Sequence, residues 1–366
     1  MRGVLLNLPD QLALALGVSL CAVVVLAAWL AATKQRRNVG EARSMKLRIG
    51  LTVAVRDADA ETLERLLSTM LASRRGRDDV IVALDRLRHE GITDDQARLL
   101  ATVARELDES GAVLRLIAAM MASKGPTQRA RGALLAGVLG LSEPIDRLAA
   151  LLEDSDVDAR QAACRALGML ASDDAAWVLI RALDGVRVNP DRVLEELELP
   201  WAAPVLELAI AAPAFAPIRS LLAEALGCAG DASATPALVA LLESGSDEER
   251  TRACRALART RSRAGIPVLC RALVDTAWQV RAQAALALGA IGRGDQKTVM
   301  ALEAGLTDPQ WWVRANCASA LVSIGPKGVA GLERALASDD RFARERAREA
   351  LALRAAAEPI DRGTAA

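Results

Sequence analysis

The residue types that most often carry out chemistry are scarce in this chain of 366 residues. It has six cysteines without a CxxC pair and a single histidine, His89, in the polar stretch RLRHEGI. Zinc sites need clustered Cys and His ligands, and a catalytic triad would have to depend on this one histidine. The sequence also lacks a Gly-rich phosphate loop, GxSxG and HExxH. We therefore expect no metal, no cofactor and no enzyme activity.

Aromatic side chains are scarce as well, with six Trp, two Phe and no Tyr. Against that background the stretch DPQWWVR, which ends at Arg314, sets Trp311 and Trp312 side by side. Aromatic residues and arginine are the usual anchors of protein interfaces. The 46 basic residues are balanced by 46 acidic ones, which argues against a nucleic-acid groove. Recognition of another protein is the chemistry that this composition favours.

An apolar segment near the amino terminus predicts a membrane anchor. Residues 12–32 read LALALGVSLCAVVVLAAWLAA, and a helix of that length spans about 30 Å, the thickness of a bilayer core. Six basic residues follow within a short distance (Lys34, Arg36, Arg37, Arg43, Lys46 and Arg48), against Arg2 before it. The positive-inside rule then predicts a single-pass protein of the plasma (inner) membrane, with its amino terminus outside and the remainder cytoplasmic. The alternative is a cleaved signal peptide and a periplasmic or secreted protein.

The rest of the chain is repetitive. Six segments share an initial arginine and an Ala- and Leu-rich pattern, and they begin at Arg160, Arg219, Arg250, Arg281, Arg314 and Arg344. The intervals of 59, 31, 31, 33 and 30 residues place a degenerate copy around Arg192. A second segment with the same period includes IDRLAALLED and TPALVALLES, and both segments have apolar residues at helical spacing. Two helices in each period of about thirty residues predict an all-α solenoid.

The pattern D-x-x-x-x-V-R-x-x-A-x-x-A-L, after a helix that contains Pro and ends in Leu-Leu, resembles the HEAT repeat. The short period and the Ala-rich second helix look most like the HEAT-like repeats of the phycobilisome-lyase type, over residues 142–353. This resemblance implies a right-handed α-solenoid whose V-R-containing helices line a concave, partner-binding face. It also implies an alternative function, that of a lyase-like factor that assists the attachment of a chromophore.

The repeated arginine lies on the buried side of its helix, since Arg314 shares a stripe with Cys317, Ala318 and Leu321. A buried cation needs a carboxylate, and an aspartate recurs in the preceding turn. By resemblance to HEAT-like repeats, we expect these residues to form a structural ladder between repeats. Its members are Arg160, Arg219, Arg250, Arg281, Arg314, Arg344, Asp154, Asp275, Asp308 and Asp339. We also expect Asp308 to cap a helix that begins at Pro309.

The positions two before, two after and five after the arginine should face solvent. The residues that we expect to bind a partner there are Trp312, Phe342, Asn316, Arg346, Gln279, Gln283, Arg252 and Arg255. Trp311 and its counterpart Trp278 are rotated toward the interior, so we expect them to pack at the edge of the core. Cys164, Cys254 and Cys317 occupy positions of small buried residues and should be unreactive.

These observations predict the following domain organisation: 1–11, an extracytoplasmic amino terminus; 12–33, a transmembrane helix; 34–50, a basic juxtamembrane segment; 51–141, a helical cap or degenerate repeats; 142–353, the solenoid; and 354–366, a disordered tail. The function that we expect is that of a non-catalytic scaffold or adaptor. Its partner would be a protein, either another integral-membrane subunit or a peripheral enzyme.

Overall fold

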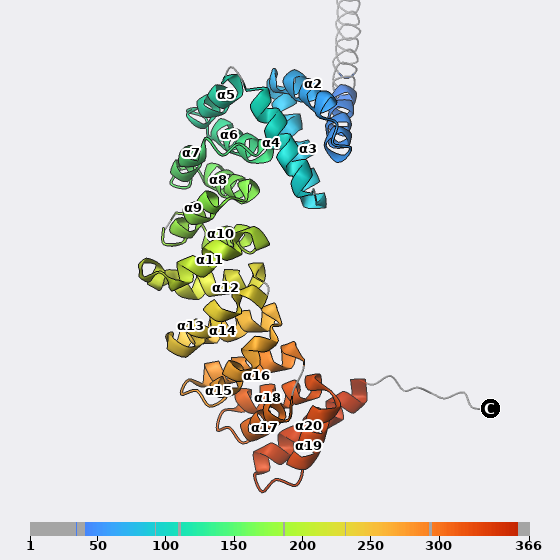
Figure 1. Cartoon of the computed structure of the whole chain (residues 1–366), viewed down its shortest axis with the longest axis vertical. Coiled ribbons are helices and arrows are strands. Elements are labelled where there is room, and N and C mark those ends of the chain that lie inside the picture. Colours follow the sequence, from blue (N-terminus) through green and yellow to red (C-terminus); the bar gives the residue numbers. More distant parts are fainter. Residues whose placement is uncertain are drawn as a thin grey trace, which may run out of the picture. The chain divides into compact units, whose positions relative to one another are not determined.

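The computed structural model describes residue 34 and residues 41–357, except 92, 109, 110, 186, 231, 293 and 294. Every regular element within this part of the chain is a helix, as the all-α prediction requires (Figure 1). The predicted transmembrane helix at 12–33 lies outside the described residues, and so does most of the predicted tail. Among the described helices, no single one is long and apolar enough to cross a membrane. The segments Pro200–Ala211 and Pro213–Ala229 meet that requirement only as a pair, and they are bent by 109°.

The internal contacts divide the chain into two compact units, Met1–Ala119 with Val138–Leu141, and Met120–Gly137 with Ser142–Ala366. Unit 1 contains helical residues 41–56, most of α5 (Ala112–Met121), and α2 (Ala60–Leu71), α3 (Arg74–Glu90) and α4 (Asp94–Glu106). Leucines such as Leu51, Leu63 and Leu100 are fully buried in its core. A capping box formed by Thr93 and Gln96 begins α4.

Unit 2 consists of helix pairs that follow one another along the chain. The first helices of the pairs are α7 (Ile145–Leu151), α9 (Asp173–Leu183), α11 (Ala203–Ala211), α13 (Thr235–Ser244), α15 (Ile266–Ala272), α17 (Gln296–Gly305) and α19 (Pro326–Ala335). The second helices are α8 (Val157–Leu170), α10 (Pro190–Leu197), α12 (Arg219–Ala229), α14 (Asp247–Thr260), α16 (Trp278–Ile291), α18 (Trp311–Ile324) and α20 (Arg341–Ala357). Short 3₁₀ turns precede several of them. Most of α6 (Pro126–Leu139), from its start to Gly137, also belongs to this unit.

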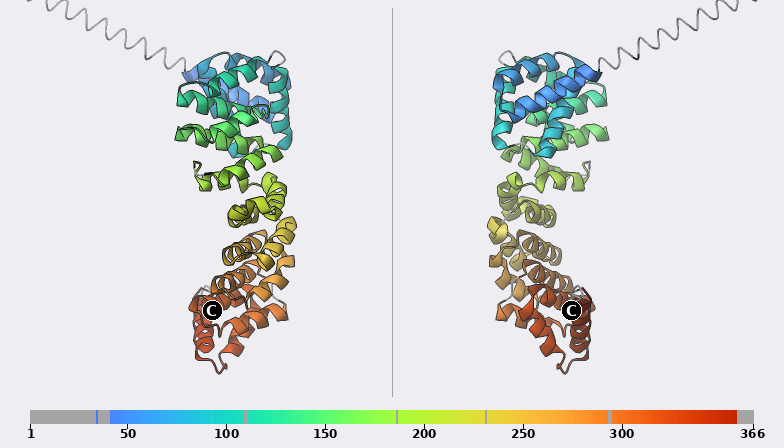
Figure 2. Two further views of the ribbon diagram at one scale, coloured as in Figure 1. Left: turned by 90° about the vertical axis from the view of Figure 1, so that its left-hand side faces the viewer. Right: turned by 90° about the vertical axis from the view of Figure 1, so that its right-hand side faces the viewer.

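The two kinds of helix form two layers. First helices contact first helices, as α13, α15 and α17 do, and second helices contact second helices, as α14, α16 and α18 do. Figure 1 shows α13 and α15 on one side of unit 2 and α14 and α16 on the other, and the two views of Figure 2 show the same order of stacking. This is the arrangement of an α-solenoid. We call the exposed side of the second helices the second-helix face.

Small residues set the distance between successive second helices. A Cβ atom added to Gly227 on α12 would lie 2.6 Å from the Cα of Ala256 on α14, and one added to Gly289 on α16 would lie 2.9 Å from the Cα of Ala320 on α18. Both glycines are eight residues after the repeated arginine, and both alanines are six residues after it. The Ala- and Gly-rich pattern of the repeats is therefore explained by close approach of the helix backbones.

Two details differ from the sequence-based expectations. The degenerate copy around Arg192 does form a second helix, α10, which packs on α8 and α12. However, Arg192 itself is exposed and bonds Glu195 at 2.8 Å on its own helix.

The prediction that a helix begins at Pro309 is wrong, because α18 begins at Trp311 with Gln310 as its N-cap. The Asp308 carboxylate accepts from the Gln310 amide at 2.8 Å and is otherwise occupied by Arg281.

Candidate functional site

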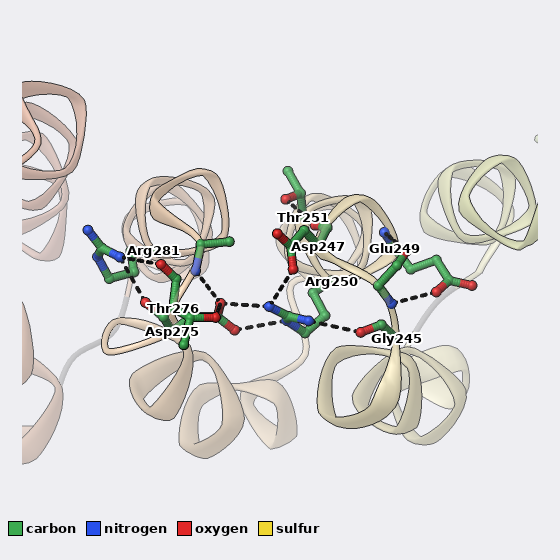
Figure 3. A network of polar contacts seen from close by, with 10 residues as sticks. Gly245, Asp247, Glu249, Arg250, Thr251, Asp275, Thr276 and Arg281 are labelled. Carbon is green, nitrogen blue, oxygen red and sulfur yellow. Dashed lines mark hydrogen bonds and ion pairs between the residues drawn. The ribbon is translucent and has the colours of Figure 1, made fainter.

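The ladder arginines join consecutive repeats in the central part of unit 2. Arg250 donates from Nε and Nη2 to the Asp275 carboxylate, at 2.9 and 2.8 Å, and from Nη1 to the Gly245 carbonyl at 2.9 Å (Figure 3). Arg281 repeats this geometry one helix pair later, with bonds of 2.7 and 3.0 Å to Asp308 and 2.8 Å to the Asp275 carbonyl. Each guanidinium thus binds the turn before its own helix and the carboxylate in the turn before the next second helix.

Other ladder positions use different partners. Arg219 pairs with Glu249 at 3.2 Å, so a glutamate replaces the expected aspartate. Asp154 pairs at 2.7 Å with Arg129 on α6, a residue that the sequence pattern did not identify because its helix lacks the repeat motif. Arg160 and Arg344 each donate to two carbonyls of their own preceding turn, the latter to Ser338 and Asp339.

Arg314, the next-to-last arginine of the ladder, differs from the expected pattern. It is only 7% exposed and donates to the carbonyls of Asp308 and Pro309 at 2.7 and 3.0 Å. Instead of a carboxylate from the next repeat, the ring of Phe342 lies over its guanidinium, 4.5 Å from the carbon atom to the ring centroid. A cation–π contact therefore takes the position of the next ion pair.

The electrostatics of the ladder are those of satisfied, partly buried ion pairs. Burial alone would raise the pKa of Asp275 and Asp308, but hydrogen bonds from their arginines and from backbone amides lower it below the ordinary value of 3.8. The hydrogen bond to Asp154 likewise raises the pKa of Arg129, and Arg129 lowers that of Asp154. The carboxylates are fully engaged, so the geometry of this ladder is structural.

The residues expected to bind a partner lie on the second-helix face with unequal exposure. Trp312 is 58% and Phe342 49% exposed, and Gln279 and Arg255 are exposed as well. Gln283, Arg252, Asn316 and Arg346 are partly buried. The Asn316 side-chain NH2 group donates to the Ala282 carbonyl at 3.0 Å, and this bond joins α18 to α16. The side-chain oxygen of Asn316 is the acceptor of the same amide group.

Three exposed aromatic residues lie toward the carboxyl-terminal end of this face, Trp311 and Trp312 on α18 and Phe342 on α20, and we call them the aromatic cluster. The two indole rings meet edge to face with centroids 4.7 Å apart. The Arg346 guanidinium from α20 lies 5.6 Å from the ring centre of Trp311. The first turn of α18 and the first two turns of α20 therefore contribute to one surface that contains aromatic rings and arginine.

The expected position of Trp311 at the edge of the core is wrong, because its side chain is 46% exposed, nearly as much as that of Trp312. Trp278 is 36% exposed in the corresponding place on α16. Both tryptophans are the first residues of their helices, where no preceding helical turn covers the ring. A helical-wheel argument assigns a face but does not include this end effect.

Other reactive residue types are buried or dispersed. Cys164, Cys254 and Cys317 are buried, and burial raises the pKa of each thiol to about 12. They are therefore protonated at neutral pH. Within the described ranges, no group of three or more His, Cys, Asp or Glu side chains is placed to hold a metal ion.

The geometry above defines the carboxyl-terminal half of the chain as a repeat solenoid with an exposed aromatic and arginine-containing surface. Residues 202–352 match the family of HEAT repeats in three overlapping placements, 202–289, 235–305 and 266–352. HEAT-like repeats are thereby confirmed for this part of the chain.

Several solved structures are similar to the chain. Human deoxyhypusine hydroxylase is 21% identical over 78% of this chain and 98% of its own, with a TM-score of 0.30. Kap121p bound to Pho4p is 14% identical over 84% of this chain and 39% of its own, with a TM-score of 0.44. A designed armadillo repeat protein is 18% identical over 57% of this chain and 98% of its own, with a TM-score of 0.32. No curated protein matches the sequence.

Proposed function

We propose that this protein is a non-catalytic scaffold that binds a protein partner on the second-helix face of its HEAT repeats. The observation that carries the proposal is the exposure of Trp311, Trp312 and Phe342 in one cluster, in a chain with only eight Trp and Phe residues in all (six and two). When large aromatic rings bind a partner, a large apolar surface is removed from contact with water. Together with arginine, such rings dominate the energetics of interfaces.

We further propose that residues 12–32 anchor the protein in the plasma (inner) membrane, with the repeats on the cytoplasmic side. The apolar length of this segment and the basic residues that follow it support the proposal. The partner would then be an integral-membrane subunit or a peripheral enzyme beside the membrane. Alkaline-phosphatase and fluorescent-protein fusions at the carboxyl end test the orientation, since phosphatase activity would contradict a cytoplasmic domain.

Site-specific photo-cross-linking tests the binding surface. A photoreactive amino acid at position 312 or 342 in the full chain, expressed in its native host, should give a discrete cross-linked product. The matched control is position 300, because Met300 on α17 is also 58% exposed but belongs to the layer of first helices. Equal cross-linking from all three positions, or none from 312 and 342, would contradict the proposed surface.

A further inference from the structure

A second charged feature on the second-helix face is a group of three arginines on α14. Arg252, Arg255 and Arg259 follow one another at intervals of three and four residues, so they share one side of the helix. All three approach one carboxylate, Glu224 on α12. Arg255 lies 3.8 Å and Arg259 3.7 Å from its Oε1, and Arg252 pairs with its Oε2. We call these three residues the arginine triplet.

One carboxylate cannot satisfy this triplet. A guanidinium carries five N–H donors, whereas a carboxylate offers about four acceptor positions. Arg252 also reaches Glu248 at 3.3 Å, but that side chain is 67% exposed, and such a surface pair contributes little. Arg259 donates to the Cys228 sulfur at 2.9 Å, a weak acceptor. The side chains of the triplet are 27–46% exposed, so donors and positive charge remain at the surface.

The residues around the triplet limit where an anion can bind. The corresponding positions on α16, the next second helix, are Gln283, Leu286 and Ala290, which carry no charge. On the other side, α12 presents Glu224, and the more distant α10 carries Glu195 and Glu196. An anionic group is thus attracted to α14 and can extend toward α16 and α18 without meeting a negative charge there.

The distance from the triplet to the aromatic cluster suits a short extended peptide. α14, α16 and α18 are consecutive second helices in contact. Packed helices lie about 8–10 Å apart, so two steps cover about 16–20 Å. Trp312 lies two residues before its repeated arginine, whereas the triplet lies two to nine residues after Arg250, which adds an offset of about 6–16 Å along the helix axes. The separation is then about 17–26 Å, and about five to eight extended residues span it at about 3.3 Å per residue. Gln279, Gln283 and Asn316 line the path between the two ends with amide groups that suit a peptide backbone.

We infer that the partner contributes an extended segment with two or three carboxylates, separated by about five to eight residues from a bulky apolar side chain. The carboxylates bind the arginine triplet and the apolar side chain packs on Trp312 and Phe342. This inference rests on the proposed function and specifies the chemistry of the partner. The Glu224 carboxylate in the centre of the triplet disfavours a continuous polyanion, and for this reason an acidic peptide fits better than an anionic lipid surface.

Peptide selection on the purified full chain tests the inference. Display of random twelve-residue peptides should enrich acidic residues that lie about five to eight positions from an aromatic or aliphatic residue. The selected peptide should bind the R252Q/R255Q/R259Q variant about tenfold more weakly. The control variant R261Q/R263Q, which changes two exposed arginines just after α14, should bind as the parent does. If the triple variant has lost its helical circular dichroism, the single substitution Arg255→Gln takes its place in the experiment. Arg255 is the most exposed arginine of the triplet, and its 3.8 Å distance to Glu224 is the longest of the three.

A double-mutant cycle makes the assignment specific. Replacing the acidic residues of the peptide by amides should weaken binding to the parent chain but cause little further loss in the triple variant. An enriched motif without acidic residues, or equal losses in both variants, would overturn the inference and leave the scaffold function intact. Triplet-dependent binding to phosphatidylserine vesicles instead of any peptide would overturn it in favour of a lipid surface. Failure to enrich any motif would contradict the proposed function as well.

Discussion

The second helices carry an inner row of arginines, which includes Arg250 on α14 and Arg281 on α16, and an outer row on α14, and the two rows have opposite roles. Arg250 and Arg281 on the inner row are 17% and 13% exposed, and each binds a carboxylate of the next repeat with two bonds. Arg252 and Arg255, on the outer row of α14, are 27% and 46% exposed and share one carboxylate with a third arginine. Arg250 and Arg252 are only two residues apart on α14, yet the first stabilises the fold and the second is available to a partner, because they face different sides of the helix.

The largest effect is expected from breaking the inner row. Arg281→Ala leaves the Asp308 carboxylate, which is only 9% exposed, without its cation. Loss of one partner of a buried pair costs about 3 kcal/mol, so the free energy of unfolding should fall by about that amount. Urea denaturation followed by circular dichroism measures the change. Arg255→Ala on the outer row is the control, and a similar loss in both variants would remove the distinction between the rows.

Overpacking between second helices should have the next largest effect. Gly227→Val places a side chain against the backbone of Ala256, and such strain costs about 2 kcal/mol. Ala352→Val is the matched control, because Ala352 on α20 also lies eight residues after its arginine but is exposed. A thermal melt of both variants should show a lower midpoint for the glycine variant alone.

Acid should weaken the inner row. Burial raises the pKa of Asp275 and Asp308, but hydrogen bonds from their arginines and from backbone amides lower the pKa by more, to below 3.8. The hydrogen bond from Arg129 likewise lowers the pKa of Asp154. A depressed carboxyl pKa adds stability that is complete above the unfolded-state value and is lost as the pH falls through the folded-state value. Unfolding midpoints should therefore decline below about pH 4, and less steeply in Asp308→Asn. An unchanged slope in that variant would contradict the role of this carboxyl group.

The smallest effect on stability is expected in the aromatic cluster. Because Trp312 is 58% exposed, Trp312→Ala should change the free energy of unfolding by no more than about 0.5 kcal/mol. Trp311→Ala should behave similarly, since its ring is 46% exposed. Both variants should instead weaken partner binding. A loss of stability in Trp311→Ala alone would restore the interpretation of Trp311 as a core residue.

Much of the architecture of unit 2 follows from sequence periodicity. The segments that begin with Arg219, Arg250, Arg281 and Arg314 are all second helices, because an apolar stripe at helical spacing has only one side that can be buried. Arg129 was missed because its helix, PTQRARGALLAGVL, lacks the alanine and leucine spacing of the others. Glu224 and Arg259 were missed because the triplet involves two helices, and sequence spacing does not indicate which residues of neighbouring repeats meet.

The sequence by itself determined the helical repeat, its period, and which side of each second helix is buried, since these depend on local spacing and on the hydrophobic effect. Tertiary structure alone decided the partner of each arginine. Asp308 binds Arg281 from the preceding repeat, and Phe342 covers Arg314 where no carboxylate does. It also decided that Trp311 is exposed beside Trp312. The reason is physical: exposure at a helix end and pairing between repeats depend on the neighbouring backbone, which no single helical period contains.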